Sequence, residues 1–168
     1  MATEIRNRVA ESGIITIDPS AYYSDGERVP FDIAPLLFEG MILREKDFRD
    51  FVKSHEWSSY SGKLVAITCT ADAVIPAWAY MLITTALKPF AGKIVLGDLD
   101  DLEKELLNDA LAEFDPGEYA DKRVMIKGCG EKNIPRSVFV KLTDMLIPHV
   151  KSIMYGEPCS SVPVYRKK

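Results

Sequence analysis

KLVAITC (63–69) is the first of four similar stretches that decide the fold, and the others are KIVLGD (93–98), KRVMIKGC (122–129) and KSIMYGEPC (151–159). Each stretch is short, rich in Val and Ile, and bounded by Gly, Asp or Pro, which is the pattern of a buried strand. The intervals between them are long enough for helices. From about residue 62 onward the sequence therefore predicts alternating strands and helices.

Three helices are predicted between these strands. Residues 76–90 are apolar nearly all round, so this helix should be largely buried. Residues 98–114 place their leucines on one face and begin at Asp98, a residue suited to an N-cap. Residues 135–146 form the third helix, which ends before Pro148 because proline discourages further helix.

The alternation of strands and helices also predicts the topology. A parallel neighbour cannot be reached through a tight turn, so the strand–helix–strand repeats require parallel pairing with right-handed crossovers. We therefore expect a doubly wound, three-layer α/β domain with four core strands in one mainly parallel sheet and three crossover helices. Residues 62–168 would form this core.

Residues 1–61 are expected to form an extension that packs on the core within a single globular domain. GIITIDP (13–19) and RVPFDI (28–33) flank an Asp-Gly pair and predict a β-hairpin. REKDFRDFVKSHEW (44–57) predicts an amphipathic helix that packs through Phe48 and Phe51. We expect this extension to cap a face of the sheet or to contact a second copy of the chain.

Composition narrows the function classes. The 168 residues are 47% hydrophobic and 27% charged, with a net charge of -4, which fits one globular domain. The basic residues are interleaved with acids, so nucleic-acid binding is not expected. No apolar stretch is long enough to span a bilayer and no signal peptide is visible. Three cysteines suit a reducing compartment, and the expected location is the cytoplasm.

The four predicted strands end in Cys69, Asp98, Cys129 and Cys159. Ligands of open α/β sheets bind at the C-terminal edge of the strands. If the strand order is two, one, three, four, the three cysteines come from adjacent strands that lie about 4.8 Å apart. Three thiolates with Asp98 or Asp72 nearby suit zinc or an iron–sulfur cluster. The leading hypothesis is a metal or iron–sulfur binding protein, an accessory in cluster assembly or repair.

Other interpretations of these residues remain open. The cysteines also fit buried small hydrophobic positions, and Asp72 and Asp98 fit helix caps. Cys69 should lie ahead of a helix N-terminus, so it is a candidate nucleophile for a thiol or redox enzyme. His55 and His149 fit surface or capping roles better than that of a catalytic base. A non-catalytic interaction module is a third hypothesis.

Three glycines are candidate ligand-binding positions. Gly128 and Gly130 flank Cys129, and Gly156 precedes Cys159 by three residues. Glycine lets the backbone approach a ligand or form an anion-binding nest, although it also serves ordinary turns. The sequence has neither G-x-G-x-x-G nor a Walker motif, so no motif predicts nucleotide binding.

Three blocks of sequence carry a family resemblance: FEGMILREKDFRDFV (38–52), the segment from AITCTADA to PAWAYMLITTAL (66–87), and SIMYGEPCSSVPVY (152–165). They resemble a bacterial family of unknown function catalogued as number 2480. The resemblance implies an association with iron–sulfur cluster assembly, and hence assembly proteins as partners. It carries no active-site residues onto this chain.

Overall fold

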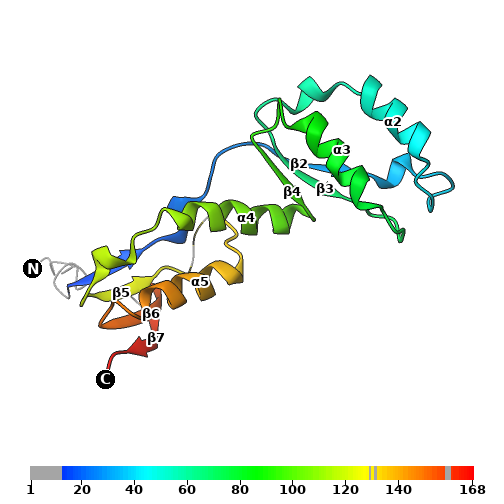
Figure 1. The fold of residues 1–168 in the computed structure, drawn as a ribbon. Helices are drawn as coiled ribbons and strands as arrows, with labels where there is room; N and C mark the ends of the chain where they lie inside the picture. Colours follow the sequence, from blue (N-terminus) through cyan, green and yellow to red (C-terminus); the bar gives the residue numbers. More distant parts are fainter. Residues whose placement is uncertain (1–12, 129, 131, 158–159) are drawn as a thin grey trace, which may run out of the picture. The chain divides into compact units, whose positions relative to one another are not determined.

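The structure is a computed structural model that describes residues 13–128, 130, 132–157 and 160–168. It shows a mixed α/β protein with two sheets (Figure 1). The chain forms two compact units, one of Asp25–Glu105 and one of Met1–Ser24 with Leu106–Lys168. These boundaries differ from those of the predicted extension (1–61) and core (62–168), and their union in one globular domain stays a prediction. Within the described residues, no helix is both long enough and apolar enough to cross a membrane.

The helices lie where the sequence predicted them, within three residues at each end. In the described part of the chain they are α2 (Glu45–Ser54), α3 (Ala77–Leu87), α4 (Leu99–Ala112) and α5 (Arg136–Leu146). Short 3-10 helices occupy Pro19–Tyr22, Ala34–Leu36, Trp57–Tyr60 and Pro116–Tyr119.

The strands form two sheets, called here sheet A and sheet B. Sheet A has the order β1-β5-β6-β7, in which the first three strands are parallel and β7 is antiparallel to β6. Sheet B has the order β2-β3-β4 and is parallel throughout. The bounds are β1 (Ile14–Ile17), β2 (Arg28–Asp32), β3 (Leu64–Thr68), β4 (Lys93–Leu96), β5 (Arg123–Ile126), β6 (Ser152–Glu157) and β7 (Ser160–Arg166).

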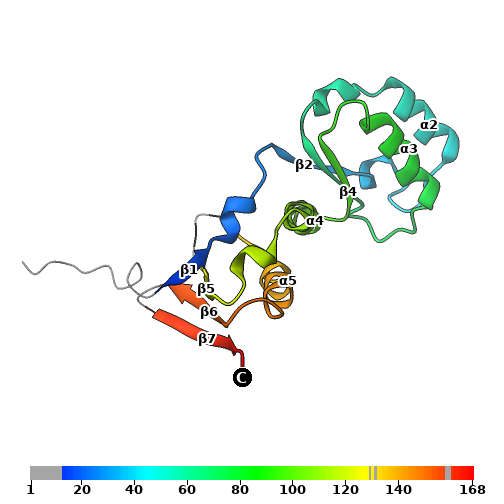
Figure 2. The same cartoon turned by 60° about the vertical axis from the view of Figure 1, so that its left-hand side comes forward.

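In the unit of sheet B, α2 and α3 pack on the same face of the sheet (Figure 2). The chain moves in one direction across this sheet, from β2 to β3 to β4, and right-handed crossovers then place their helices on one face. Successive side chains of a strand point to opposite faces of the sheet, so every second residue points into this core. Its buried residues are Phe31, Ile33, Leu37, Phe48, Trp57, Val65, Ile67, Ala79, Ile83 and Leu87.

In the unit of sheet A, α4 and α5 supply the helical side of the core. Apolar residues spaced three or four apart on each helix meet alternate residues of β1, β5 and β6. The buried residues are Ile17, Leu107, Leu111, Phe114, Val124, Ile126, Val138, Leu142, Leu146, Val150 and Ile153.

The expectation of a single doubly wound, three-layer sheet with four core strands is wrong. β3 and β4 lie in sheet B, whereas β5 and β6 lie in sheet A. Helix α4 connects strands of different sheets, and such a connection has the same strand–helix–strand pattern as a crossover within one sheet. A doubly wound sheet also needs crossovers on both faces, but α2 and α3 share a face. The coarser prediction of an α/β fold with mainly parallel strands is confirmed.

The predicted N-terminal hairpin is also wrong, because β1 pairs with β5 and β2 pairs with β3, both in parallel. The chain leaves β1 through a 3-10 helix that Asp18 caps, with its Oδ1 accepting from the Ser20 N–H at 2.9 Å. Gly26 does adopt a φ of +133°, but it lies against the Leu64 side chain instead of joining two paired strands. The predicted helix α2 is confirmed and buries Phe48.

Strand β7 was not predicted. Proline interrupts its apolar pattern at Pro163, and most of its side chains are exposed. A proline is tolerated at a sheet edge because an edge strand leaves some backbone donors unpaired. The pairing with β6 includes a register shift between Ile153 and Met154.

Candidate functional site

A cavity of about 550 Å³ lies at the carboxyl ends of the parallel strands of sheet A. β1 ends at Ile17 and β5 ends at Ile126, which are paired in register. Lys127, the residue directly after β5, donates its N–H to the Ile17 carbonyl at 2.9 Å. This continuation of the ladder places Lys127 beside Asp18, so residues far apart in the sequence meet at one edge.

The cavity carries a surplus of positive charge. Among its described lining residues, Lys127, Lys132 and Arg136 are cationic and Asp18 alone is anionic, which leaves a surplus of two positive charges. The whole chain has a net charge of -4. The cavity is therefore a basic site on an acidic protein, and electrostatics there favour an anionic ligand.

Asp18 positions its neighbours and is itself fully engaged. Its carboxylate accepts hydrogen bonds from the Ser20 N–H at 2.9 Å and the Ser20 hydroxyl at 2.6 Å. It also pairs with the Lys127 ammonium at 3.0 Å. The Ser20 hydroxyl, followed by the Lys127 ammonium, holds the pKa of Asp18 below its ordinary value of 3.8. Asp18 is thus an ionised anchor for Lys127 and not a proton donor near neutral pH.

The N-terminus of helix α5 lies at the cavity. Its N-cap residue is Pro135, which makes no side-chain capping bond, and Arg136 is the first helical residue. The Val138 N–H bonds to the Pro135 carbonyl at 3.0 Å. The first N–H groups of a helix lack partners within the helix and carry its positive dipole end, so they favour an anion.

Two aromatic side chains form one wall of the cavity. Tyr155 and Phe139 meet edge to face, with ring centroids 5.6 Å apart and an interplanar angle of 84°. Gly128 lies against the Tyr155 ring, and a Cβ at that position would lie 2.5 Å from the ring's Cζ. The Lys132 ammonium lies over the Tyr23 ring, 4.7 Å from its centroid.

The structure places two of the three predicted glycines at this cavity. Gly128 and Gly130 are lining residues. Gly156 is not among them; it has a φ of +124°, and a Cβ there would collide with the Ser160 carbonyl oxygen. The positive φ and the close approach of Ser160 thus explain Gly156 without a ligand. A ligand role for the three glycines stays a prediction.

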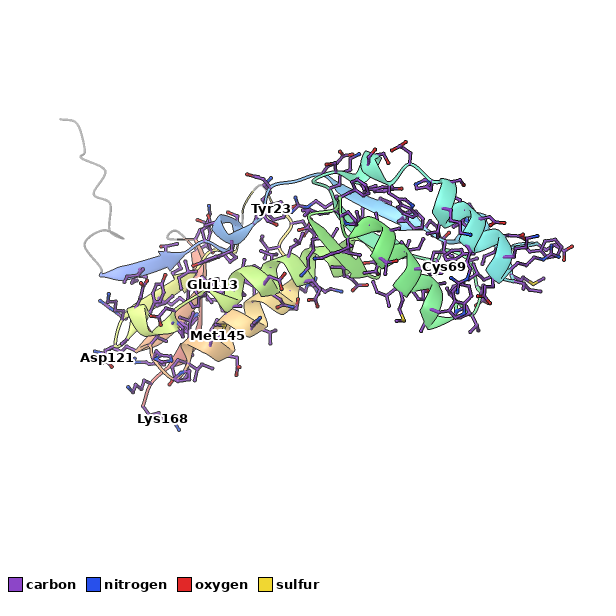
Figure 3. All side chains as sticks on the ribbon, turned by 45° about the horizontal axis from the view of Figure 1, so that its top comes forward. Tyr23, Cys69, Glu113, Asp121, Met145 and Lys168 are labelled. Carbon is purple, nitrogen blue, oxygen red and sulfur yellow. The ribbon has the colours of Figure 1, made fainter. Side chains whose placement is uncertain are left out.

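Two of the three predicted cysteine ligands, Cys129 and Cys159, lie outside the described residues. The third, Cys69, follows β3 in the unit of sheet B and is labelled in Figure 3. It is half-buried against the sheet B core, with its Sγ 3.7 Å from the Ala71 carbonyl oxygen. Burial raises the pKa of the nearby Tyr80, and Cys69 adds to this shift.

The predicted carboxylate ligands have other positions. Asp98 caps α4, because its Oδ1 accepts from the Asp101 N–H at 2.9 Å. In turn, the Asp101 Oδ2 accepts from the Asp98 N–H at 3.3 Å. Asp98 and Cys69 both follow neighbouring strands of sheet B, as predicted. Asp72 is exposed in the connection from β3 to α3. Within the described residues, no three His, Cys, Asp or Glu side chains are grouped to hold a metal ion.

The metal and iron–sulfur hypothesis has lost the geometric premise that supported it. It assumed one sheet edge for all three cysteines, whereas β3 belongs to sheet B, and β5 and β6 belong to sheet A. The hypothesis itself stays a prediction, as do the thiol enzyme centred on Cys69, the assembly-protein partners and the second copy of the chain. Iron, sulfide and zinc analysis of protein purified without oxygen, beside its Cys129→Ser variant, tests the ligand set directly.

The histidines have structural surroundings. The His55 N–H bonds to the Phe51 carbonyl at 2.9 Å and closes α2, and its ring lies 4.6 Å from that of Trp57. His149 follows α5, with its N–H bonded to the Leu146 carbonyl at 3.0 Å. His55 is thus the C-cap residue of α2, one of the surface or capping roles expected for the two histidines.

The sequence interpretation missed the basic residues of the cavity. They lie within KGCGEKNIPR (127–136), where three cations and two glycines occur in ten residues between a strand and a helix. That density was a usable signal for an anion site.

A family model described as "Protein of unknown function (DUF2480)" matches residues 3–167 of the chain. This match confirms the resemblance carried by the three sequence blocks. No curated protein matches the chain, and no solved structure does. Function must therefore be inferred from the geometry of the site.

Proposed function

We propose that this chain, which belongs to the DUF2480 family of unknown function, binds a phosphate-bearing small molecule in the cavity of sheet A. The observation that carries the proposal is the surplus of two positive charges among the described lining residues, next to the start of α5, where the N-cap residue Pro135 makes no side-chain capping bond. A phosphate monoester carries about -1.5 to -2 charges at neutral pH, which matches that surplus.

The chemistry of the cations suits phosphate. A guanidinium such as that of Arg136 presents two parallel N–H donors to a pair of phosphate oxygens, and Lys132 supplies a compact ammonium charge. Within the described residues, no ion pair engages Arg136 or Lys132. Both charges are therefore available to a ligand, while Lys127 is held by Asp18.

The size of the cavity indicates a small molecule. Its volume of about 550 Å³ falls in the range of roughly 300–1,000 Å³ that is usual for ligand pockets. The aromatic wall of Phe139 and Tyr155 supplies apolar surface next to the cations. A nucleic-acid backbone would need a longer basic track than three residues at one sheet edge.

The test is titration calorimetry with ethyl phosphate on the wild type and on Arg136→Gln. Loss of charge-assisted hydrogen bonds worth about 1.5–3 kcal/mol should weaken binding roughly 10- to 150-fold. Arg166→Gln is the matched control, because Arg166 is an exposed arginine of β7 that does not line this cavity. A wild type that does not bind ethyl phosphate, or an Arg136→Gln variant that binds it unchanged, would refute the proposal.

A further inference from the structure

An apolar groove adjoins the phosphate cavity in the unit of sheet A. It has a volume of about 440 Å³ and lies between α5 and the sheet. Phe139 and Tyr155 line both the groove and the cavity, so the two hollows meet at this aromatic pair. A ligand that fills both would cross the edge-to-face contact of the two rings.

The groove exposes apolar side chains from two elements. Val140 on α5 is 71% exposed, Ile147 just after α5 is 39% exposed, and Val164 on β7 is 51% exposed. Helix α5 otherwise buries its apolar residues in the core, as Val138, Leu142 and Leu146 do. The groove is therefore an apolar surface additional to the core face of the helix, and an apolar group that covered it would gain hydrophobic free energy.

The distribution of charge gives a bound molecule one orientation. Among the described residues that line the groove, Asp144 is the one charged side chain, and it is negative. The cavity on the other side of the aromatic pair is positive. An anionic head is thus favoured in the cavity and disfavoured in the groove, where an uncharged tail fits.

We infer that the ligand is an amphiphilic phosphate monoester, with its phosphate on Arg136 and Lys132 and an alkyl or aryl tail lying across Tyr155 into the groove. This inference rests on the proposed function and adds the class of the ligand. Tyr155 and Phe139, which meet edge to face, provide apolar surface where head and tail join. Val140 and Val164 flank the tail.

The test compares phosphate monoesters of increasing alkyl length by titration calorimetry, at concentrations too low for micelles. Each methylene buried in the groove should tighten binding roughly fourfold, so octyl phosphate should bind far more tightly than ethyl phosphate. Octanol and octanoate test the head group, and both should bind at least tenfold more weakly than octyl phosphate.

The double variant Val140→Thr/Val164→Thr tests the place of the tail. It keeps side-chain shape but puts hydroxyls in the groove, and the octyl-to-ethyl affinity ratio should fall at least threefold. Val162→Thr is the matched control, because Val162 is a β7 valine that is 61% exposed and does not line the groove. Its octyl-to-ethyl ratio should equal that of the wild type.

The outcomes separate the two proposals. If no phosphate ester binds, the proposed function fails. If all esters bind equally whatever their length, or if the double variant keeps the wild-type octyl-to-ethyl affinity ratio, phosphate binding is retained and the proposed place of the tail in the groove is refuted. If octanoate or octanol binds as tightly as octyl phosphate, the proposal that the head group is a phosphate is refuted. A dimer in gel filtration that Val140→Asp dissociates would show that a second copy occupies the groove instead.

Discussion

Tyr155 lies so close to Gly128 that a Cβ on residue 128 would be 2.5 Å from Cζ and 2.6 Å from the hydroxyl oxygen of the ring. On its other side the ring meets Phe139 edge to face. Gly128 follows β5 and Tyr155 lies in β6, so the contact joins neighbouring strands at the cavity. The position of the aromatic wall therefore depends on the absence of a side chain at residue 128.

We expect Gly128→Ala to displace the Tyr155 ring and to weaken binding of octyl phosphate. Because the contact is with the outer end of a 40% exposed side chain, the ring has room to move, and the cost in stability should be only about 1 kcal/mol. Near-ultraviolet circular dichroism measures the change in the environment of the Tyr155 ring, and calorimetry measures the affinity for octyl phosphate. Gly92→Ala is the control, because Gly92 does not line the cavity and a Cβ there would lie no closer than 3.4 Å to another atom. Equal spectra and affinities for the two variants would contradict this account.

Asp98 provides a test that separates a helix cap from a metal ligand. Its carboxylate accepts the Asp101 N–H at 2.9 Å at the start of α4. We expect Asp98→Ala to lower the free energy of unfolding by about 1 kcal/mol, and Asp98→Asn to recover most of that loss because asparagine also caps helices. Urea denaturation measures both, with Asp100→Ala in the same helical turn as the control. A loss of bound metal in Asp98→Asn would show a ligand role instead.

The ion pair of Arg28 and Glu103 should stabilise the unit of sheet B. Arg28 Nε lies 2.6 Å from Glu103 Oε1, and the two side chains are only 14% and 15% exposed. Removal of one charge leaves the other poorly solvated, so Glu103→Gln should cost about 2 kcal/mol, less than for a fully buried pair. Glu105→Gln, at an exposed position of the same helix, should cost less than about 0.5 kcal/mol. If urea denaturation gives the same loss in the free energy of unfolding for both variants, the prediction is contradicted.

The local elements of the fold were predictable because each depends on neighbours in the sequence. Asp98 begins α4 through its own side chain, and Pro148 lies just beyond the end of α5. The hydrophobic spacing of α2 was sufficient to predict that Phe48 is buried. These signals are local, and tertiary packing did not override them.

The pairing of the strands was not predictable in the same way. Both α3 and α4 join one predicted strand to the next, yet α3 returns to the same sheet and α4 leads to another. Nothing in the periodicity of a helix reports the partner of the strand that follows it. The prediction that the cysteine-bearing strands share one sheet edge depended on the pairing partner of each strand. That prediction is wrong, although every core strand was located correctly.

The cavity of sheet A was predictable only in part. Gly128 and Gly130 were identified because glycine between a strand and a helix indicates close backbone approach. Asp18 was not identified, because its partner Lys127 is 109 residues away and meets it only through the pairing of β1 with β5. Long-range pairs of this kind require the sheet topology first.

Asp32 gives the last prediction, which concerns acid stability. It is the last residue of β2, and its carboxylate accepts the N–H of Ala34 at 2.9 Å and the N–H of Thr70 at 3.0 Å. Burial raises the pKa of Asp32, but the hydroxyl of Thr70 and these two N–H groups outweigh burial, so the pKa lies below its ordinary value of 3.8.

A group whose pKa is lowered by folding stabilises the folded state fully above its unfolded pKa, and this contribution is lost as the pH falls through the folded pKa. Asp32→Asn should therefore be less stable than the wild type by about 1–2 kcal/mol at pH 7, and the difference should shrink below about pH 4. Urea denaturation at pH 7, 5, 4 and 3 measures it, with the exposed Asp50→Asn as the control. A wild-type advantage that is constant down to pH 3 would mean that the Asp32 charge does not hold the Thr70 loop beside Cys69.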